Sequence, residues 1–536
     1  MNRGRRFFLL TIASVLVLIG PFLIGYHFSA IRDVSLQLYH GSPSIPSFSK
    51  TPDPLTRKIH LILPATGPTI DLCKLLLSGG ILGYPEPIFI GWEGRGIFNG
   101  SQSHLFKITE TLTYLRTLPR EADTDMIVIL DAYDIWLQLR PDVLLNRYYE
   151  VLRKNDLRLQ KDGILGKQIN GYKIESKIII GPDKIYWPQG PEDPATWAVP
   201  QSPLPEDIFG PDTDTDAPTS RPRWLNSGTI MGPAKEMRDY FAATVDMVSK
   251  IYDSSWEFRT SDQYYFAEVW AEQEVMRRKL QAELKGQAFQ PSLVPGTNET
   301  GIVPHIPAGK RTEYGILQDY NTDVFQTAAG FELWLTWMRF NGSTKPADLS
   351  RRRRSSSSTE TRIDEMPLPA YVRDSAPPYA ATRSSASANQ STWEQMLLGT
   401  NVIMKTVFPL FHMTGDKTLK YRWWPRMWFH PHAEALLTAG KRAREEQEDP
   451  DFIADMHGIR WMQARPDLGK MGRYEAGKDG KGGAWVDNGK YVRFANMCGS
   501  FEDYLYLRRS EAVDLHSEVD MEEEVEEEEG DEGDEG

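Results

Sequence analysis

Short apolar runs alternate with segments of helical spacing between residues 57 and 130. Ile59–Leu63, Pro87–Ile90 and Met126–Leu130 are apolar runs of strand length, whereas Ile70–Leu77 and His104–Leu118 have the spacing of helices. Continuous apolar runs are typical of strands that are buried on both faces. Their alternation with helices is typical of a parallel sheet covered by helices. The pattern predicts an α/β fold with a largely parallel, Rossmann-like sheet.

The longest apolar run lies before this region. Residues 7–28 contain no charged side chain, and three arginines precede them. A helix over this run is about 33 Å long, which is enough to cross the hydrocarbon core of a bilayer. A cleaved signal peptide is the alternative, but it has a shorter apolar stretch and small residues before the cleavage site, where this chain has Phe28. We therefore predict a transmembrane signal anchor at 7–28, with residues 1–6 cytosolic and the rest lumenal.

Shifts in composition suggest the other boundaries. Residues 29–56 are rich in Ser and Pro, which is typical of a stem between an anchor and a folded body. Two later stretches, one crowded with Pro and Asp and one with runs of Arg and Ser, lack periodicity and are interpreted as insertions. The predicted divisions are a folded body at 57–421 with insertions at 182–223 and 345–390, a C-terminal extension at 422–510 and a disordered acidic tail at 511–536.

Charge and cysteine content narrow the function classes. Of 74 acidic residues, thirteen lie between Glu518 and Glu535, so the rest of the chain has 61 acidic and 61 basic residues and gives no sign of a nucleic-acid groove. Cys73 and Cys498 allow at most one disulfide, and their spacing does not say whether they pair. Four N-glycosylation acceptor motifs are consistent with a lumenal body, although chance supplies about two or three in a chain of this length; they begin at Asn99, Asn298, Asn341 and Asn389.

Two aspartates follow the last of the predicted strands. Met126–Leu130 leads directly into Asp131, and Asp134 lies three residues later. In an open α/β sheet, ligands gather beyond the carboxyl ends of the strands. Two carboxylates at such an edge are suitable ligands for Mg²⁺ or Mn²⁺, with a diphosphate completing the coordination. The alternative is that one aspartate caps a turn and the other is merely exposed.

Four further motifs follow this pair in order. They are Trp224–Gly232 (WLNSGTIMG), Ser261–Phe266 (SDQYYF), Asn321–Gln326 (NTDVFQ) and Phe408–Lys417 (FPLFHMTGDK). Together with the aspartate pair, they resemble the glycosyltransferase domain of the procollagen lysyl hydroxylases and related collagen-type galactosyl- and glucosyltransferases, which have the GT-A fold. The resemblance covers roughly residues 59–421, with both insertions outside it.

The resemblance implies a set of site residues. His412 joins Asp131 and Asp134 as metal ligands, which favours Mn²⁺ over Mg²⁺ because the donors include an imidazole. Taken alone, a histidine beside Phe411 is more often a core residue. The implied contacts to the uridine diphosphate come from Thr66, Lys107, Tyr133, Gly415 and Lys417, with Lys420 an alternative to Lys417. The implied sugar pocket contains Trp187, Ser227, Gly228 and Gln263, together with Asn226, which is also a candidate catalytic residue.

Asp262 is the candidate base or electrostatic stabiliser. It matches the last carboxylate of an acidic cluster in the resembling family, but Ser261 precedes it here, so the cluster is shorter. The alternative is a helix cap, because Ser261 and Asp262 open the apolar stretch Tyr264–Trp270. After Tyr421, no histidine has an aspartate two positions later, so the iron-binding pattern of the hydroxylase domain is not found and no hydroxylase activity is expected.

These observations predict a single-pass type II membrane protein of the Golgi or endoplasmic reticulum. Its expected activity is metal-dependent transfer of a hexose from a nucleotide sugar to a glycan or protein acceptor. Two alternatives remain at this point. One is an inactive lumenal scaffold with the same fold, and the other is a membrane-anchored hydrolase that uses paired carboxylates.

Overall fold

The computed structural model describes residues 56–96, 103–293, 299–341, 366–380, 392–465 and 481–506. Several predicted features lie outside these ranges: the cytosolic end at 1–6, the signal anchor at 7–28, nearly all of the stem, the acidic tail, and the acceptor motifs at Asn99, Asn298 and Asn389. Among the helices within these ranges, none has the length and apolar character needed to span a bilayer.

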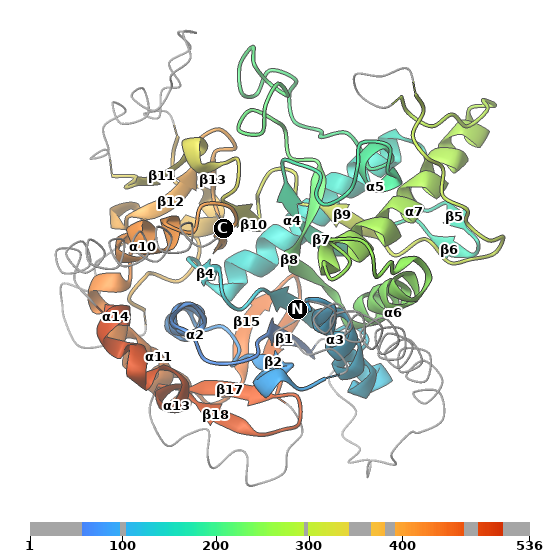
Figure 1. The fold of residues 1–536 in the computed structure, drawn as a ribbon. Coiled ribbons are helices and arrows are strands. Elements are labelled where there is room, and N and C mark those ends of the chain that lie inside the picture. Colours follow the sequence, from blue (N-terminus) through green and yellow to red (C-terminus); the bar gives the residue numbers. More distant parts are fainter. Residues whose placement is uncertain are drawn as a thin grey trace, which may run out of the picture.

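A mixed sheet of ten strands runs through the middle of the described fold (Figure 1). Its central strand is β1 (Thr56–Pro64), which pairs in parallel with β3 (Met126–Leu130) on one side. On the other side β1 pairs in parallel with β2 (Ile88–Ile90) and β16 (Ile459–Gln463). The carboxyl ends of β1 and β3 therefore lie side by side at one edge of the sheet, which is the edge where open α/β sheets bind ligands.

The sheet continues beyond β3 with a change of direction. β8 (Trp224–Pro233) lies antiparallel between β3 and β7 (Ile178–Asp183), and β9 (Ile316–Gln318) pairs in parallel with β7. Because β8 runs opposite to β3, its first residues lie beside the carboxyl end of β3. The α/β class and the parallel-rich centre agree with the prediction, and the antiparallel β8 adds to it.

Side chains on successive residues of the central strands enter two separate cores. Leu61, Leu63 and Val128 belong to one core, and Ile62 and Ile129 belong to the other. This arrangement explains the unbroken apolar runs, since each strand is covered by helices on both faces. The first core is covered by α2 (Ile70–Leu82), α4 (Pro141–Lys161) and α11 (Ala433–Glu445), and the second by α3 (Leu105–Thr117), α6 (Ala234–Ile251) and α7 (Asp262–Leu284) (Figure 1).

A second, three-stranded sheet lies next to the edge where β1 and β3 end. β14 (Leu410–His412) is its middle strand, parallel to β10 (Phe325–Thr327) and antiparallel to β4 (Ile135–Leu137). His412 pairs with Ile135, the residue after Asp134. This pairing brings two segments that are distant in the sequence to one place.

The C-terminal extension is part of the central sheet. β16 pairs with β1, and β17 (Gly483–Val486) pairs with β2. Cys73 of α2 forms a disulfide with Cys498 of α13 (Phe494–Cys498), which joins the extension to the first helix. The boundary predicted at residue 421 therefore does not separate two sheets, because strand pairing with distant segments is not visible in a local pattern.

Both predicted insertions contain packed residues. Pro182 and Asp183 complete β7, and Trp197 and Phe209 are buried, so the segment at 182–223 is attached to the body. Within the insertion at 345–390, the structure describes residues 366–380, which include the short helix α9 (Ala370–Arg373). The segment at 182–223 is largely irregular, as predicted, but its buried aromatic residues anchor it to the folded body.

The remaining elements are short. The strands are β5 (Gln168–Ile169), β6 (Tyr172–Lys173), β11 (Leu335–Met338), β12 (Leu398–Asn401), β13 (Thr406–Val407), β15 (Phe452–Met456) and β18 (Tyr491–Arg493). The helices are α5 (Pro194–Trp197), α10 (Leu419–Trp423) and α14 (Glu502–Tyr506). The 3₁₀ turns are η1 (Trp92–Gly94), η2 (Arg120–Ala122), η3 (Glu332–Trp334), η6 (Trp393–Gln395), η7 (Trp424–Arg426), η8 (His430–His432) and η9 (Gly499–Phe501).

Candidate metal and nucleotide site

Asp131 lies directly after the buried strand β3. Its backbone N–H donates a hydrogen bond of 2.8 Å to the carbonyl of Gly228 in β8. This bond extends the pairing of β3 and β8 by one step, so that the carboxylate of Asp131 projects from the end of a rigid strand. The apolar run Met126–Leu130 thus positions the first candidate ligand, as the sequence predicts.

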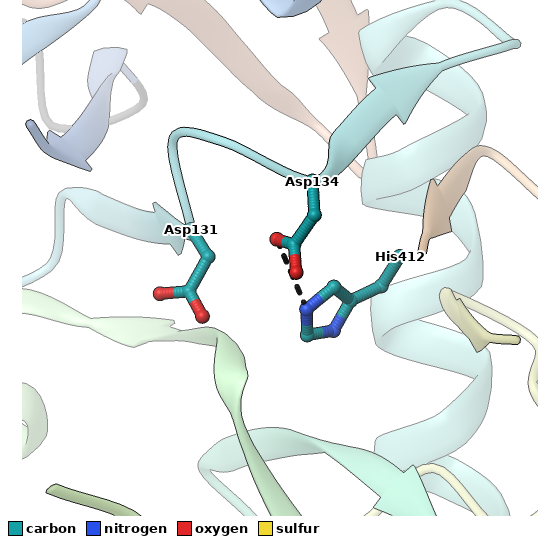
Figure 2. A group of neighbouring side chains, drawn as sticks. All are labelled: Asp131, Asp134 and His412. Carbon is teal, nitrogen blue, oxygen red and sulfur yellow. Dashed lines mark ion pairs between the residues drawn. The ribbon is translucent and has the colours of Figure 1, made fainter. Parts of the chain in front are cut away.

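Asp134 and His412 complete a group of three possible ligands. Asp131, Asp134 and His412 each offer one ligand atom, and these atoms all lie within 4.8 Å of one another. Figure 2 shows Asp134 on the turn after β3 and His412 at the end of β14, with the Asp134 Oδ1 atom 3.3 Å from the His412 Nε2 atom. The structure therefore brings together the three residues that the resemblance implies as metal ligands.

Gly228 leaves the space between these ligands open. A Cβ atom on this residue would lie 2.1 Å from His412 Cε1, 2.7 Å from Asp131 Oδ2 and 2.8 Å from His412 Nε2. Such distances are too short for any side chain, so the position requires glycine for steric reasons. Two carboxylates and an imidazole around a space kept free by glycine are suitable for a divalent cation.

Cationic groups stabilise the charged form of Asp134. Burial alone favours the neutral acid, but His412, Lys417 and Lys420 outweigh burial and hold the pKa of Asp134 well below its usual range. Lys417 Nζ lies 3.3 Å from Asp134 Oδ2, and the Lys417 side chain is 61% exposed. Lys420 instead donates to Asp71 Oδ2 and to the carbonyl of Tyr133. Of the two lysines, Lys417 is thus the one with an exposed ammonium group.

Lys107 is buried, and its ammonium group contacts Asp131 on the side away from Asp134. Its ammonium group lies 2.7 Å from Asp131 Oδ1, 3.0 Å from Asp262 Oδ2 and 2.7 Å from the carbonyl of Ser227. Burial opposes the charge of Lys107, but Asp131 and Asp262 raise its pKa above the usual range. Two hydrogen bonds and one further ion pair hold the ammonium group in place, which is consistent with a positioning role for Lys107 beside the nucleotide contact that the resemblance implies.

The loop after β1 is held by Tyr133. Its hydroxyl accepts hydrogen bonds from the backbone N–H groups of Thr66 and Gly67, at 2.8 Å and 3.1 Å, and donates one to the carbonyl of Gly67. Thr69 then caps α2 by accepting from the N–H of Leu72. Thr66 and Tyr133, both predicted to be near the nucleotide, are therefore in direct contact at the carboxyl ends of β1 and β3.

The predicted sugar-pocket residues form one hydrogen-bonded group. Gln263 accepts from the N–H of Ser227 at 3.2 Å and donates to the carbonyl of Trp187 at 2.8 Å. Asn226 Oδ1 accepts from the N–H of Gly228 at 3.0 Å. Asp262 is buried at the start of α7, where Lys107 outweighs the effect of burial and lowers its pKa.

Gly415 lies in the segment after β14 with a φ of 76°. This left-handed conformation strongly favours glycine and explains that residue in the motif Phe408–Lys417. The turn returns Lys417 towards Asp134, as the pair at 3.3 Å shows. Gly415 therefore shapes the segment that carries both His412 and Lys417.

Asp183 is a site residue that the sequence reasoning missed. It ends β7, is buried, and accepts a 3.4 Å hydrogen bond from Asn226 Nδ2. Burial raises the pKa of Asp183 to about 6, against the opposing effects of Asn226 and nearby backbone N–H groups. The available signal was the strand–Asp junction Ile178–Asp183, which has the same form as the junction at Asp131 but contains a Gly-Pro interruption.

Comparison of the chain with protein-family models and with curated proteins returned no match.

Proposed function

We propose that this protein is a metal-dependent glycosyltransferase of the GT-A type. It transfers a hexose from a nucleotide sugar, with uridine diphosphate as the expected leaving group, to a glycan or protein acceptor. The observation that supports this most is the convergence of Asp131, Asp134 and His412 around the space left by Gly228. Their place at the carboxyl ends of β1 and β3 is where open α/β sheets bind nucleotides.

Asp131, Asp134 and His412 are the proposed ligands of Mn²⁺, with Mg²⁺ as the alternative. Carboxylate oxygens suit either ion, and the imidazole favours manganese. When bound, such an ion supplies Lewis-acid stabilisation of the negative charge on the departing nucleoside diphosphate. Asp131 uses Oδ1 for Lys107, which leaves Oδ2 directed at the space beside Gly228 and His412.

Other residues of the chain have proposed roles in binding the donor. Tyr133 holds the Thr66–Gly67 loop in place for the nucleotide. Gly415 shapes the following turn, and Lys417 offers an exposed ammonium group to the phosphates. Asn226, Ser227, Gly228, Gln263 and Trp187 line the proposed hexose pocket.

Asp262 has a narrower role in this proposal than a free general base. Its carboxylate forms an ion pair with Lys107 and is buried, so it is charged and oriented but has a low affinity for a proton. This arrangement favours electrostatic stabilisation of a sugar cation over proton abstraction. The signal anchor and the lumenal location in the Golgi or endoplasmic reticulum belong to the same proposal and rest on residues 1–56.

The test uses the full-length protein with Mn²⁺ and a panel of nucleotide sugars, and it measures the release of free nucleotide. Asp134→Asn is expected to reduce release about 100-fold or more, because one metal ligand loses its charge. Asp374→Asn, at a carboxylate that is 74% exposed, is the matched control and is expected to change nothing. If no donor is bound or cleaved, and Asp131→Ala changes nothing, the inactive scaffold replaces the transferase.

A further inference from the structure

Four aromatic side chains form a continuous group beside the candidate site. We call Trp187, Trp256, Phe258 and Tyr264 the aromatic platform. Trp187 meets Phe258 at 5.3 Å between ring centroids, Phe258 meets Trp256 at 5.8 Å, and Trp256 meets Tyr264 at 4.4 Å. The rings come from two parts of the chain, the segment after β7 and the stretch 256–264, which runs from the α6–α7 connection into the first turn of α7.

The aromatic platform is accessible to solvent. Trp187 is 44% exposed, the other three members are half-buried, and the neighbouring Ile185 and Tyr186 are 43% and 40% exposed. Aromatic side chains that gather at a surface and keep part of their rings exposed are candidates for contact with a ligand. A structural role alone does not require these rings to face solvent.

Hydrogen bonds hold the two segments of the platform together. Gln263 Nε2 donates to the carbonyl of Trp187 at 2.8 Å, and Gln189 Nε2 donates to the carbonyl of Tyr264 at 3.3 Å. Tyr265 also donates its hydroxyl to the carbonyl of Arg259, which fixes the loop that carries Trp256 and Phe258. A surface ordered before binding loses little conformational entropy when a ligand arrives.

The platform is continuous with the candidate site. Gln263 contacts both the carbonyl of Trp187 and the N–H of Ser227, next to Gly228. Asp262, the preceding residue, forms the ion pair with Lys107. The aromatic platform therefore lies next to residues of the proposed hexose pocket.

We propose that the aromatic platform binds a pyranose ring of a neutral glycan acceptor. The face of an aromatic ring carries negative charge density, so it attracts the polarised C–H groups on the face of a sugar ring. The exposed charges nearby, Asp253 and Glu257, are acidic, and Arg259 donates to the carbonyl of Trp256. An acidic glycan is disfavoured by these charges. The inference rests on the proposed function, because it assigns the acceptor of the same site.

The experiment measures saturation-transfer NMR of the full-length protein with methyl pyranosides of glucose, galactose, mannose and N-acetylglucosamine. At least one of them is expected to bind, and Trp256→Ala and Phe258→Ala are expected to weaken its binding about tenfold. Trp256→Tyr is expected to retain most of the affinity, because it keeps an aromatic face. Tyr504→Ala, at a tyrosine that is 52% exposed in α14, is the matched control.

Nucleotide and Mn²⁺ binding are measured on the same samples, and the platform variants are expected to leave both unchanged. The inference is overturned if none of the pyranosides binds, if Trp256→Ala and Phe258→Ala bind as well as the wild type, or if a proline-rich peptide binds the platform in their place. If pyranosides bind through Trp256 while no metal or nucleotide binds, the proposed transferase fails and the glycan-binding site stands.

Discussion

Two groups of charged side chains lie on either side of Asp131, one around the partly buried Asp134 and one around the buried Asp262, and they differ in the groups that face the carboxylate. In the metal-ligand cluster, Asp134 faces His412 at 3.3 Å and the exposed Lys417 at 3.3 Å. In the lysine cluster, Asp262 faces Lys107 at 3.0 Å, and both side chains are less than one-tenth exposed. Asp131 joins the two clusters, since its Oδ1 contacts Lys107 and its Oδ2 lies towards Gly228.

The difference between the two clusters indicates which carboxylates can bind a metal ion. A divalent cation can take the place of the exposed Lys417 beside Asp134 at little cost, and His412 can serve as one of its ligands. A buried ammonium group cannot be displaced in this way, because its removal leaves uncompensated charge in the interior. A divalent cation can therefore bind in the metal-ligand cluster, whereas in the lysine cluster the buried ammonium group of Lys107 already occupies the place of a cation.

The largest expected effect is on the lysine cluster. Lys107→Met leaves the buried Asp262 with only the exposed His104, at 3.9 Å, as an ion-pair partner among the described residues, so the free energy of unfolding is expected to fall by about 3–5 kcal/mol. Lys417→Met removes an exposed lysine and is expected to change it by less than about 1 kcal/mol. Chemical denaturation of both variants measures the two changes. If the free energy of unfolding fell equally in both variants, the two clusters would not differ in how strongly they depend on their lysine.

The next effect tests the open space in the metal-ligand cluster. Gly228→Ala places a methyl group where His412 and Asp131 converge, so the affinity for Mn²⁺ is expected to fall about 100-fold. Gly499→Ala is the control, since an added Cβ there meets nothing within 4 Å. Titration with Mn²⁺ followed by electron paramagnetic resonance measures both. Undiminished affinity in Gly228→Ala would place the ion elsewhere.

The smallest effect concerns Asp183, whose carboxylate accepts hydrogen bonds from two uncharged donors, the backbone N–H of Lys184 at 2.8 Å and the side-chain amide of Asn226 at 3.4 Å. Burial raises its pKa to about 6 in the folded protein, so folding favours the neutral acid. Its contribution to stability is complete below the pKa of the unfolded chain, near pH 4, and is lost as the pH rises through about 6. Asp183→Asn stays neutral, so relative to wild type it is expected to gain about 2 kcal/mol between pH 4 and pH 7.5.

Unfolding free energies of wild type and Asp183→Asn at the two pH values measure this gain. Asp374→Asn, at the exposed carboxylate, is the control and is expected to show none. A constant difference between wild type and Asp183→Asn would show that Asp183 is not neutralised by folding.

The parts of the fold that local pattern predicted best are the buried strands and their helices. The strand Met126–Leu130 has the predicted bounds, and the helix predicted at His104–Leu118 is observed at Leu105–Thr117. Apolar periodicity is sufficient there because both faces of each strand are covered. The same reasoning missed the pairing of β16 and β17 with the central sheet, because sheet pairing between distant segments leaves no local periodicity.

The same contrast between local pattern and contacts of distant segments applies to the candidate site. Asp131 was predictable because it follows a buried strand directly, and Asp134 because it lies three residues further on. His412 required the resemblance, since a histidine within an apolar motif is more often part of a core. Lys107 was predicted to contact the nucleotide, and its contacts with Asp131, Asp262 and Ser227 depend on how α3, α7 and β8 pack together. Asp183 was missed because a Gly-Pro pair interrupts its apolar run.

The sequence alone thus determined the α/β alternation and the two aspartates at a strand end, since both follow from apolar patterns within a few residues. The tertiary structure decided which of the carboxylates is open to a cation. The antiparallel pairing of β8 with β3 places Gly228 beside Asp131, and the pairing of β14 with β4 places His412 beside Asp134. These distances depend on contacts between segments far apart in the chain, which no local pattern specifies.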